Sequence, residues 1–578
     1  MGKALYPVSA GRAKPAPLSA IVLITVIGGL LLPIAAGLWQ TARAGVSILP
    51  SIGSESFSLA PFAQLVATPG FATALRLSLF TGLVATLLSF ILAIGLTAAL
   101  YGRLSVRARG RLLTPFLAAP HAAMAIGLAF LLAPSGWIAR ALSMVTGWDR
   151  PPMIATVNDP AGIALILGLM VKELPFLLLV IYAALSQLPV RQHLALGQSL
   201  GYGRGMVWLK VITPQIWPLI RLPVMVVLAY SLSVVDMALI LGPSHPPTLA
   251  VLLLRLFSSP DITMLLPASA GALVQAALVA GAFALLWGCE RAARLVGRWW
   301  LRRGARGLSL QPLFWMAGLF SGLLFVFGGL AMLALLLWSL AWRWSWPMLL
   351  PQSWSLMAWA SPASGWADAL GNTLILAFGT TSLSLLLAVA WLEAEDRQGR
   401  GRALAREVLI YLPLLVPQIG FLFGLNILFL QMGLTGGYAA VIWAQTLFVF
   451  PYVMIALSDP WRALDPKLLR SAAALGAGPW RRLVFVKLPV LLTPILTAAA
   501  IGVAVSVAQY LPTLFMGAGR IATLTTEAVT LSSASDRRVT GVYASLQAGL
   551  PFAAYAAAFL LPAILYRNRR ALQSGDRP

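Results

Sequence analysis

The sequence predicts an all-α polytopic membrane protein with about 12 transmembrane helices, arranged as two parallel six-helix repeats. Three observations predict this class. The 578 residues are 60% hydrophobic and only 10% charged, whereas soluble domains contain about 25% charged residues. Apolar windows of about 20 residues or more, long enough to cross a bilayer, recur along the chain. A 20-residue basic segment between such windows occurs twice.

The apolar windows predict helices, because the strands of a membrane barrel would alternate in hydrophobicity. The windows lie near residues 17–41, 73–101, 112–134, 161–187, 215–242, 264–288, 313–341, 370–393, 405–431, 437–459, 489–516 and 545–566. The first window is longer than a signal-peptide core of about 7–15 residues. We therefore expect an uncleaved first span, with cleavage near "TARAG" as the alternative.

Basic residues orient these spans. With both termini in the cytoplasm, the inner loops and tails hold 30 of the 41 Lys and Arg residues, and the outer loops hold 8. Cytoplasmic loops of membrane proteins carry such an excess. This orientation accounts for the net charge of +24, so we expect a multi-pass membrane protein that binds no nucleic acid.

The composition also disfavours several chemistries. Cys289 is the only cysteine, and His121, His193 and His245 are far apart in the sequence. We expect no metal site and no cofactor. No G-x-x-x-x-G-K-[ST] loop occurs, so the chain does not bind ATP by that route.

The duplicated segment is the most informative feature of the chain. Residues 470–489, "RSAAALGAGPWRRLVFVKLP", align without gaps with residues 195–214, "ALGQSLGYGRGMVWLKVITP", at a separation of 275 residues. Features around the two copies also match, as Pro175 does with Pro451, Asp236 with Gln509, and the apolar run from Leu75 with the run from Leu370.

The repeat divides the chain into two halves. We predict a first six-span repeat at 1–288, a basic cytoplasmic linker at 289–312 and a second six-span repeat at 313–578. The halves are parallel because each contributes an even number of spans.

The residue types predict a helix–turn–helix unit beneath the membrane in each half. In the second copy, residues 470–475 favour a short helix, Gly476 can end it at positive φ, and Pro479 suits the first turn of a second helix. The matched positions are Ala195 with Arg470, Leu200 with Leu475, Gly201 with Gly476, and Pro214 with Pro489. Such a unit, joined to a spanning helix, is suited to transmitting force, and an ordinary basic loop is the alternative.

Both copies resemble the "EAA" loop of permease subunits in binding-protein-dependent ABC importers, whose pattern is E-A-A-x-x-x-G followed by L-P 13 residues after the Gly. The resemblance covers essentially the whole chain, as two fused permease domains of the iron(III) and thiamine importer kind, or of a less characterised relative. It implies a type I importer fold, loops that dock on a cytoplasmic ATPase present in two copies, and a solute-binding protein outside. Ala195 and Arg470 stand where the family has Glu, which removes an acidic docking contact but leaves the turn geometry.

Charged residues inside spans are costly and often functional. Lys172 and Glu173 in the fourth predicted span are candidate pathway residues, with a self-neutralising local pair as the alternative. Asp236 and Gln509 lie in the spans after the duplicated loops, where the resemblance implies a transmembrane gate, and an interfacial position near the span ends is the alternative.

These features favour a permease that is not itself an enzyme, with ATP hydrolysis on a separate subunit. The substrate implied by the resemblance is iron(III), thiamine or a related small solute, and a small anion or a polyamine stays open. An ion-coupled secondary transporter with 6+6 repeats is the alternative. An intramembrane enzyme would need clustered His, Asp, Glu or Cys, which the sequence pattern does not predict. A neighbouring gene for a P-loop ATPase would separate the first hypothesis from the other two.

Overall fold

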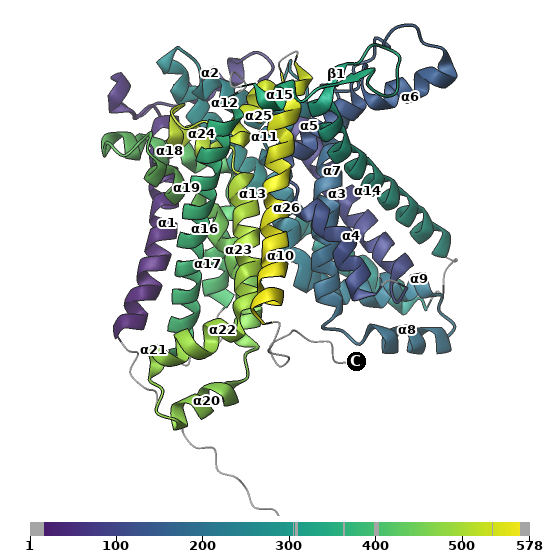
Figure 1. Cartoon of the computed structure of the whole chain (residues 1–578), viewed down its shortest axis with the longest axis vertical. Helices are drawn as coiled ribbons and strands as arrows, with labels where there is room; N and C mark the ends of the chain where they lie inside the picture. The colour runs from purple at the N-terminus through teal and green to yellow at the C-terminus, as the bar shows by residue number, and fades with distance from the viewer. Residues whose placement is uncertain are drawn as a thin grey trace, which may run out of the picture.

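The protein is a helical bundle in the computed structural model, which describes residues 17–103, 105–304, 306, 310–361, 365–397, 404–533 and 536–566 (Figure 1). The predicted N-terminal and C-terminal cytoplasmic tails lie outside the described residues. Long helices run along one direction, and short helices cover both ends of the bundle.

The first part of the chain consists of helices alone. They are α1 (Pro17–Gly45), η1 (Pro50–Ile52), α2 (Ala60–Ala67), α3 (Phe71–Leu100), α4 (Val106–Ala118), α5 (His121–Leu132), α6 (Trp137–Thr146), α7 (Ile163–Leu185), α8 (Val190–Ser199), α9 (Arg204–Val207), the π-helical η2 (Trp208–Ile212), α10 (Thr213–Ser233), α11 (Asp236–Leu241), α12 (Leu249–Phe257), η3 (Ile262–Met264) and α13 (Leu265–Arg302).

The second part adds one short antiparallel hairpin. Its elements are α14 (Gln311–Leu340), β1 (Ala341–Arg343), β2 (Ser353–Trp354), α15 (Met357–Ala360), α16 (Trp366–Arg397), α17 (Leu404–Leu415), α18 (Gln418–Gln431), α19 (Tyr438–Arg462), α20 (Pro466–Ala474), α21 (Pro479–Arg482), the π-helical η5 (Leu483–Lys487), α22 (Leu488–Val490), α23 (Leu492–Val507), α24 (Leu511–Gly517), α25 (Leu524–Leu531) and α26 (Arg537–Leu565).

The polytopic all-α class is confirmed. In the described part of the chain, 10 helices are long and apolar enough to cross a membrane, and the number reaches 12 if each of two bent pairs is one span. One bent pair, Leu409–Leu415 with Gln418–Gln431, turns by 103°. The other, Pro479–Val490 with Leu492–Val507, turns by 75°.

Several predicted spans are broken rather than continuous. The predicted windows 112–134 and 405–431 are interrupted before Pro120 and Pro417. A proline disfavours the helical conformation of the residue before it, which explains both breaks. The predicted linker 289–312 begins inside α13, which stays helical as far as Arg302.

The first helix of each half packs on the opposite half. Helix α1 packs against α16 and α18, and α14 packs against α3 and α5. Both contacts depend on close backbone approach. A Cβ on Gly424 would lie 1.9 Å from the carbonyl oxygen of Gly37, and a Cβ on Gly127 would lie 2.4 Å from that of Ala331. Small residues allow this approach between membrane helices, and the two contacts join the halves into one bundle.

We predict that Gly424→Leu destabilises the protein strongly, because its side chain has no space against the backbone of α1. Overpacking of this kind costs about 1–3 kcal/mol and occasionally more. Gly322→Leu is the matched control, since a Cβ at Gly322 meets nothing within 4 Å. Thermal unfolding of the detergent-purified variants measures the difference, and equal unfolding temperatures for the two would contradict the packing account.

Candidate coupling loops and translocation pathway

The two duplicated loops share one backbone conformation. Gly201 and Gly476 have φ values of +80° and +82° and end α8 and α20. Around Gly476, the N–H of Gly476 donates to the Ala473 carbonyl and that of Ala477 to the Ala472 carbonyl, both at 3.0 Å. This hydrogen-bond pattern is a Schellman-type helix end. It favours glycine at the position of Gly476, because the residue there must adopt positive φ.

The predicted loop residues occupy matching places in both copies. Ala195 and Arg470 lie in α8 and α20, Leu200 and Leu475 are the last residues before the glycines, Pro214 lies in the first turn of α10, Pro479 begins α21, and Pro489 lies in α22. The first helix of the second copy begins earlier than the predicted 470, at Pro466. The Asp465 carboxylate accepts a hydrogen bond of 2.8 Å from the Lys467 N–H and caps that helix.

Each loop contains a π-helical turn that the sequence analysis missed. These turns, η2 and η5, begin at Trp208 and Leu483, again 275 residues apart. A proline ring clashes with the carbonyl four residues before it, and the carbonyls opposed by Pro214 and Pro489 lie inside these turns. The widened turn therefore has a local cause in each half.

A network of ion pairs holds the second loop to the end of α16. Lys487, only 4% exposed, donates hydrogen bonds of 2.6 Å to the carboxylates of both Glu393 and Asp396. The Trp461 indole donates to Asp396 at 3.0 Å. Arg462 in α19 donates a hydrogen bond of 3.0 Å to Glu395, which also lies in α16. Charged groups thus join the loop, α16 and α19.

Aromatic packing holds the first loop instead. Trp208 is fully buried, and its ring lies 5.7 Å from that of Tyr101 at the end of α3. The Lys210 ammonium lies 4.6 Å from the ring centre of Trp300 in α13, and Arg204 donates at 2.7 Å to the Tyr101 carbonyl. The two loops therefore have the same shape but different anchors.

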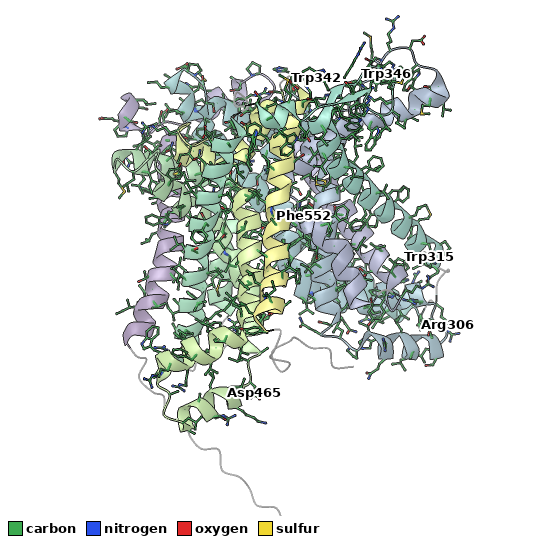
Figure 2. All side chains as sticks on the ribbon, in the orientation of Figure 1. Arg306, Trp315, Trp342, Trp346, Asp465 and Phe552 are labelled. Carbon is green, nitrogen blue, oxygen red and sulfur yellow. The ribbon has the colours of Figure 1, made fainter. Side chains whose placement is uncertain are left out.

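Both loops present apolar side chains to solvent at one end of the bundle. Leu475 is 88% exposed and Leu200 is 56% exposed. Figure 2 shows Asp465 beside the protruding α20 and Arg306 beside α8, at that same end. Exposed apolar patches next to polar residues are typical of protein–protein contact sites.

The predicted pathway residues Lys172 and Glu173 have different surroundings. Lys172 donates to the carbonyls of Phe116 at 2.9 Å and Ala119 at 2.6 Å. These carbonyls end α4 and lack helical partners because of the break before Pro120. Lys172 therefore caps a broken helix. The Glu173 carboxylate lies 3.7 Å from Nε2 of His121, the first residue of α5.

Asp236 lies close to these residues, at the break between α10 and α11. It is 8% exposed and interacts electrostatically with His121, Tyr230 and Tyr510, whereas Glu173 interacts with Tyr230 and Tyr452. These residues form one cluster between the two halves, which we call the junction cluster. Its members are His121, Glu173, Tyr230, Asp236, Tyr452 and Tyr510. In the described residues no group of three His, Cys, Asp or Glu side chains could hold a metal ion.

Sequence reasoning missed four members of this cluster. His121 belongs to no metal-binding pair in the sequence, but it directly follows the proline at a helix break. Tyr452 follows Pro451, and Tyr510 follows Gln509, so both lie beside positions that the repeat had marked. Tyr230 carried no sequence signal of its own.

Gln509 lies at the break between α23 and α24 and is 9% exposed. A neutral network runs beside it. The Gln445 side chain accepts hydrogen bonds from Ser506 at 2.5 Å and Thr380 at 3.2 Å, and donates to Thr513 at 2.9 Å. The second half thus has neutral polar groups in its interior where the first half has charged ones.

At the opposite end of the bundle, an open cleft of about 590 Å³ lies between the halves. Its lining residues are Ser135, Trp338, Ala341, Trp342, Trp344, Asp536, Arg537 and Arg538. The hydrogen bonds from Arg538 hold the pKa of Asp536 below its ordinary value, and Arg537 donates at 3.0 Å to Ser135 of the first half.

A bundle of membrane-length helices with two matching loops at one end is the architecture expected of a transport permease. No family model matches the chain. The chain is 31% identical over 505 residues to the inner membrane ABC transporter permease protein YnjC of Escherichia coli, covering 87% of this chain and 90% of that protein. It belongs to the ABC transporter permease family, and it is a multi-pass inner-membrane protein.

Two further relatives match parts of the chain. The putative 2-aminoethylphosphonate transport system permease protein PhnV of Salmonella typhimurium is 28% identical over 198 residues, which are 33% of this chain and 74% of that protein. The molybdenum transport system permease protein ModB of Haemophilus influenzae is 32% identical over 142 residues, 22% of this chain and 61% of that protein. Membership of this family implies an ATPase partner and a substrate-binding protein.

We predict that Lys487→Ile destabilises the protein, because the carboxylates of Glu393 and Asp396 lose the buried ammonium that lies 2.6 Å from both, and among the described residues only Arg397 stays paired with Glu393. Removing one partner of a buried ion pair costs about 3–5 kcal/mol. Ile212 occupies the matching position of the first half, where Ala98 and Tyr101 match Glu393 and Asp396.

The triple variant Lys487→Ile/Glu393→Ala/Asp396→Tyr should therefore regain most of the lost stability. The exposed Lys467→Ile serves as the control. Thermal unfolding of the purified proteins checks both expectations, and a single Lys487→Ile variant as stable as the parent would contradict the role of the network.

Proposed function

We propose that the protein is the permease of an ATP-driven importer and forms the solute pathway with both of its halves. The observation that carries this proposal is the pair of loops, residues 195–214 and 470–489, with one backbone conformation at one end of the bundle. Each loop docks on one of two copies of a cytoplasmic ATPase. A solute-binding protein delivers the solute at the outer face. The permease catalyses no reaction itself.

Coupling proceeds through the helices that follow the loops. In the first half, α9, η2 and α10 form one uninterrupted span from Arg204 to Ser233, so movement of the loop moves α10. In the second half, the chain bends by 75° between α22 and α23. Both following helices end at breaks, beside Asp236 and Gln509, and these breaks form the gate. Closure of the two ATPases thus moves α10 and α23, which end beside the junction cluster in the two halves.

The sidedness follows from the basic loops. The end that carries α8 and α20 faces the cytoplasm, since positive residues collect there. Helix α1 begins and α26 ends at that end (Figure 1), which supports cytoplasmic termini. The outer cleft, which spans both halves, then faces the binding protein. The division into repeats at 1–288 and 313–578 also belongs to this proposal, with α1 and α14 exchanged between the halves.

The transported solute is a small molecule. Iron(III) and thiamine follow from the resemblance to importers of those solutes, while the names of PhnV and ModB point to 2-aminoethylphosphonate and molybdenum for those proteins. The junction cluster is the feature of this chain that helps to choose among these candidate solutes.

We predict that Gly476→Pro and Gly201→Pro abolish co-purification with the partner ATPase. Proline fixes φ near −65°, whereas the docking turns need φ values of +82° and +80°. Gly478→Pro and Gly203→Pro are matched controls two residues away, because those glycines already have φ values of −67° and −63°. The measurement is a pull-down of the solubilised full chain with its candidate ABC ATPase.

Retention of the ATPase by the controls and its loss from the two variants is the expected result. If no ATPase binds the parent chain, or if the Gly201→Pro and Gly476→Pro variants bind it as well as the parent does, the loops are not docking elements. An ion-coupled secondary transporter then becomes the better hypothesis.

A further inference from the structure

We propose that the junction cluster binds the ammonium group of the transported solute, which makes the substrate a small organic cation or a molecule with a cationic end. This inference rests on the proposed permease function and adds the chemical class of the substrate to it. Four features of the cluster support it, namely its charge balance, its tyrosine side chains, the lack of a three-ligand metal geometry among the described residues, and its place between the halves.

The carboxylates of the cluster lack a fixed cation in direct contact. Glu173 and Asp236 are 6% and 8% exposed, and among the described residues no Lys or Arg nitrogen lies within 4 Å of either carboxylate. Lys172 is within electrostatic range of both, but its ammonium donates to the carbonyls that end α4. His121 is the one histidine in contact, at 3.7 Å from Glu173.

A buried carboxylate without a paired cation is costly. The cost is offset when a cationic ligand enters, so the protein gains most from a solute that brings the missing positive charge. An anion would meet two carboxylates and gain nothing from them.

Tyrosine side chains lie near these carboxylates and interact with them electrostatically. The Tyr230 ring lies 4.7 Å from the ring of His121, and its hydroxyl is buried against Asp236 without the geometry of a full hydrogen bond. Tyr452 and Tyr510 interact electrostatically with Glu173 and Asp236. Tyrosine faces attract ammonium groups, and rings combined with carboxylates are a common way to recognise them. The Tyr230 hydroxyl, buried beside Asp236, offers a further polar contact to a ligand.

The cluster is poorly suited to a bare metal ion. Its two carboxylates and one histidine do not converge to a three-ligand site in the described structure. This geometry weakens the iron(III) hypothesis and favours an organic cation, whose charge is spread over a larger volume.

The cluster is also formed by both halves. Glu173, Tyr230 and Asp236 come from α7, α10 and α11, whereas Tyr452 and Tyr510 belong to α19 and the break before α24. A cation bound here would hold the halves together at the breaks that follow the coupling loops. Solute binding and loop movement would then be linked through the same residues.

Thermal unfolding of the full chain in lipid nanodiscs tests the proposal. The probes are choline and putrescine as cations, with phosphate and molybdate as anions, at one ionic strength. We expect the cations alone to raise the unfolding temperature in a saturable manner. Glu173→Gln and Asp236→Asn should each weaken the apparent affinity for the cations at least about tenfold. Asp149→Asn, at an exposed acid outside the bundle, should leave it unchanged.

Tyr452→Leu is a second variant that leaves both carboxylates in place, and it should also weaken cation binding. It keeps the test decisive if a carboxylate variant fails to fold. Equal stabilisation by the anions, unchanged cation affinity in the variants, or no stabilisation by either cation would overturn the proposal. Co-purification of the same variants with the ATPase separates the two hypotheses, because its retention would leave the permease function standing.

Discussion

The structure depends on one constraint, which is that backbone polar groups inside a bilayer must find partners within the protein. Continuous helices satisfy it alone, but the protein interrupts helices at Pro120 and Pro417 and again beside Asp236 and Gln509. Each interruption frees carbonyl or N–H groups. Lys172 shows how the chain meets this cost, since its ammonium caps the carbonyls at the end of α4. Breaks are tolerated because they lie inside the bundle, and there they gather the polar side chains that a pathway needs.

The two halves combine a shared backbone with different side chains. Each half receives the first helix of the other half through a close glycine contact, between α1 and α18 in one case and between α14 and α5 in the other. Each loop also contains a π-helical turn. The anchors do not. Lys487 and its carboxylates hold the second loop, while Trp208 and Tyr101 hold the first. Beside the helix breaks that follow the loops, the first half has the charged Asp236 where the second half has the neutral Gln509. Duplication preserved the geometry that transmits force, and the anchoring and pathway chemistry diverged.

Local sequence signals were enough to predict much of this. Apolar length predicted the spans, and the Gly and Pro spacing predicted the helix–turn–helix units, because these features depend on residues close together in the chain. The Asp465-Pro466 pair could also have predicted where α20 begins. The helix breaks were within reach too, since prolines mark two of them.

The junction cluster could not be predicted in the same way. His121 and Asp236 are more than 100 residues apart, and the packing of α11 on α5 and α7 brings them together. Tyr452 of α19 is more than 200 residues further along the chain and interacts electrostatically with Glu173. Lys172 and Glu173 are neighbours in sequence, yet their side chains have separate partners. Their individual roles depend on tertiary contacts for which a single sequence has no signal.

The most direct test of the central claim is the distance between the two loops as the partner ATPase binds ATP. Spin labels at Leu200→Cys and Leu475→Cys, in a Cys289→Ser background, occupy exposed positions that leave the glycine turns intact. Electron–electron double resonance on the complex should show the labels moving closer when ATP binds and apart after hydrolysis. A distance that stays the same in every nucleotide state would contradict the account, because loops that do not move cannot drive the gate.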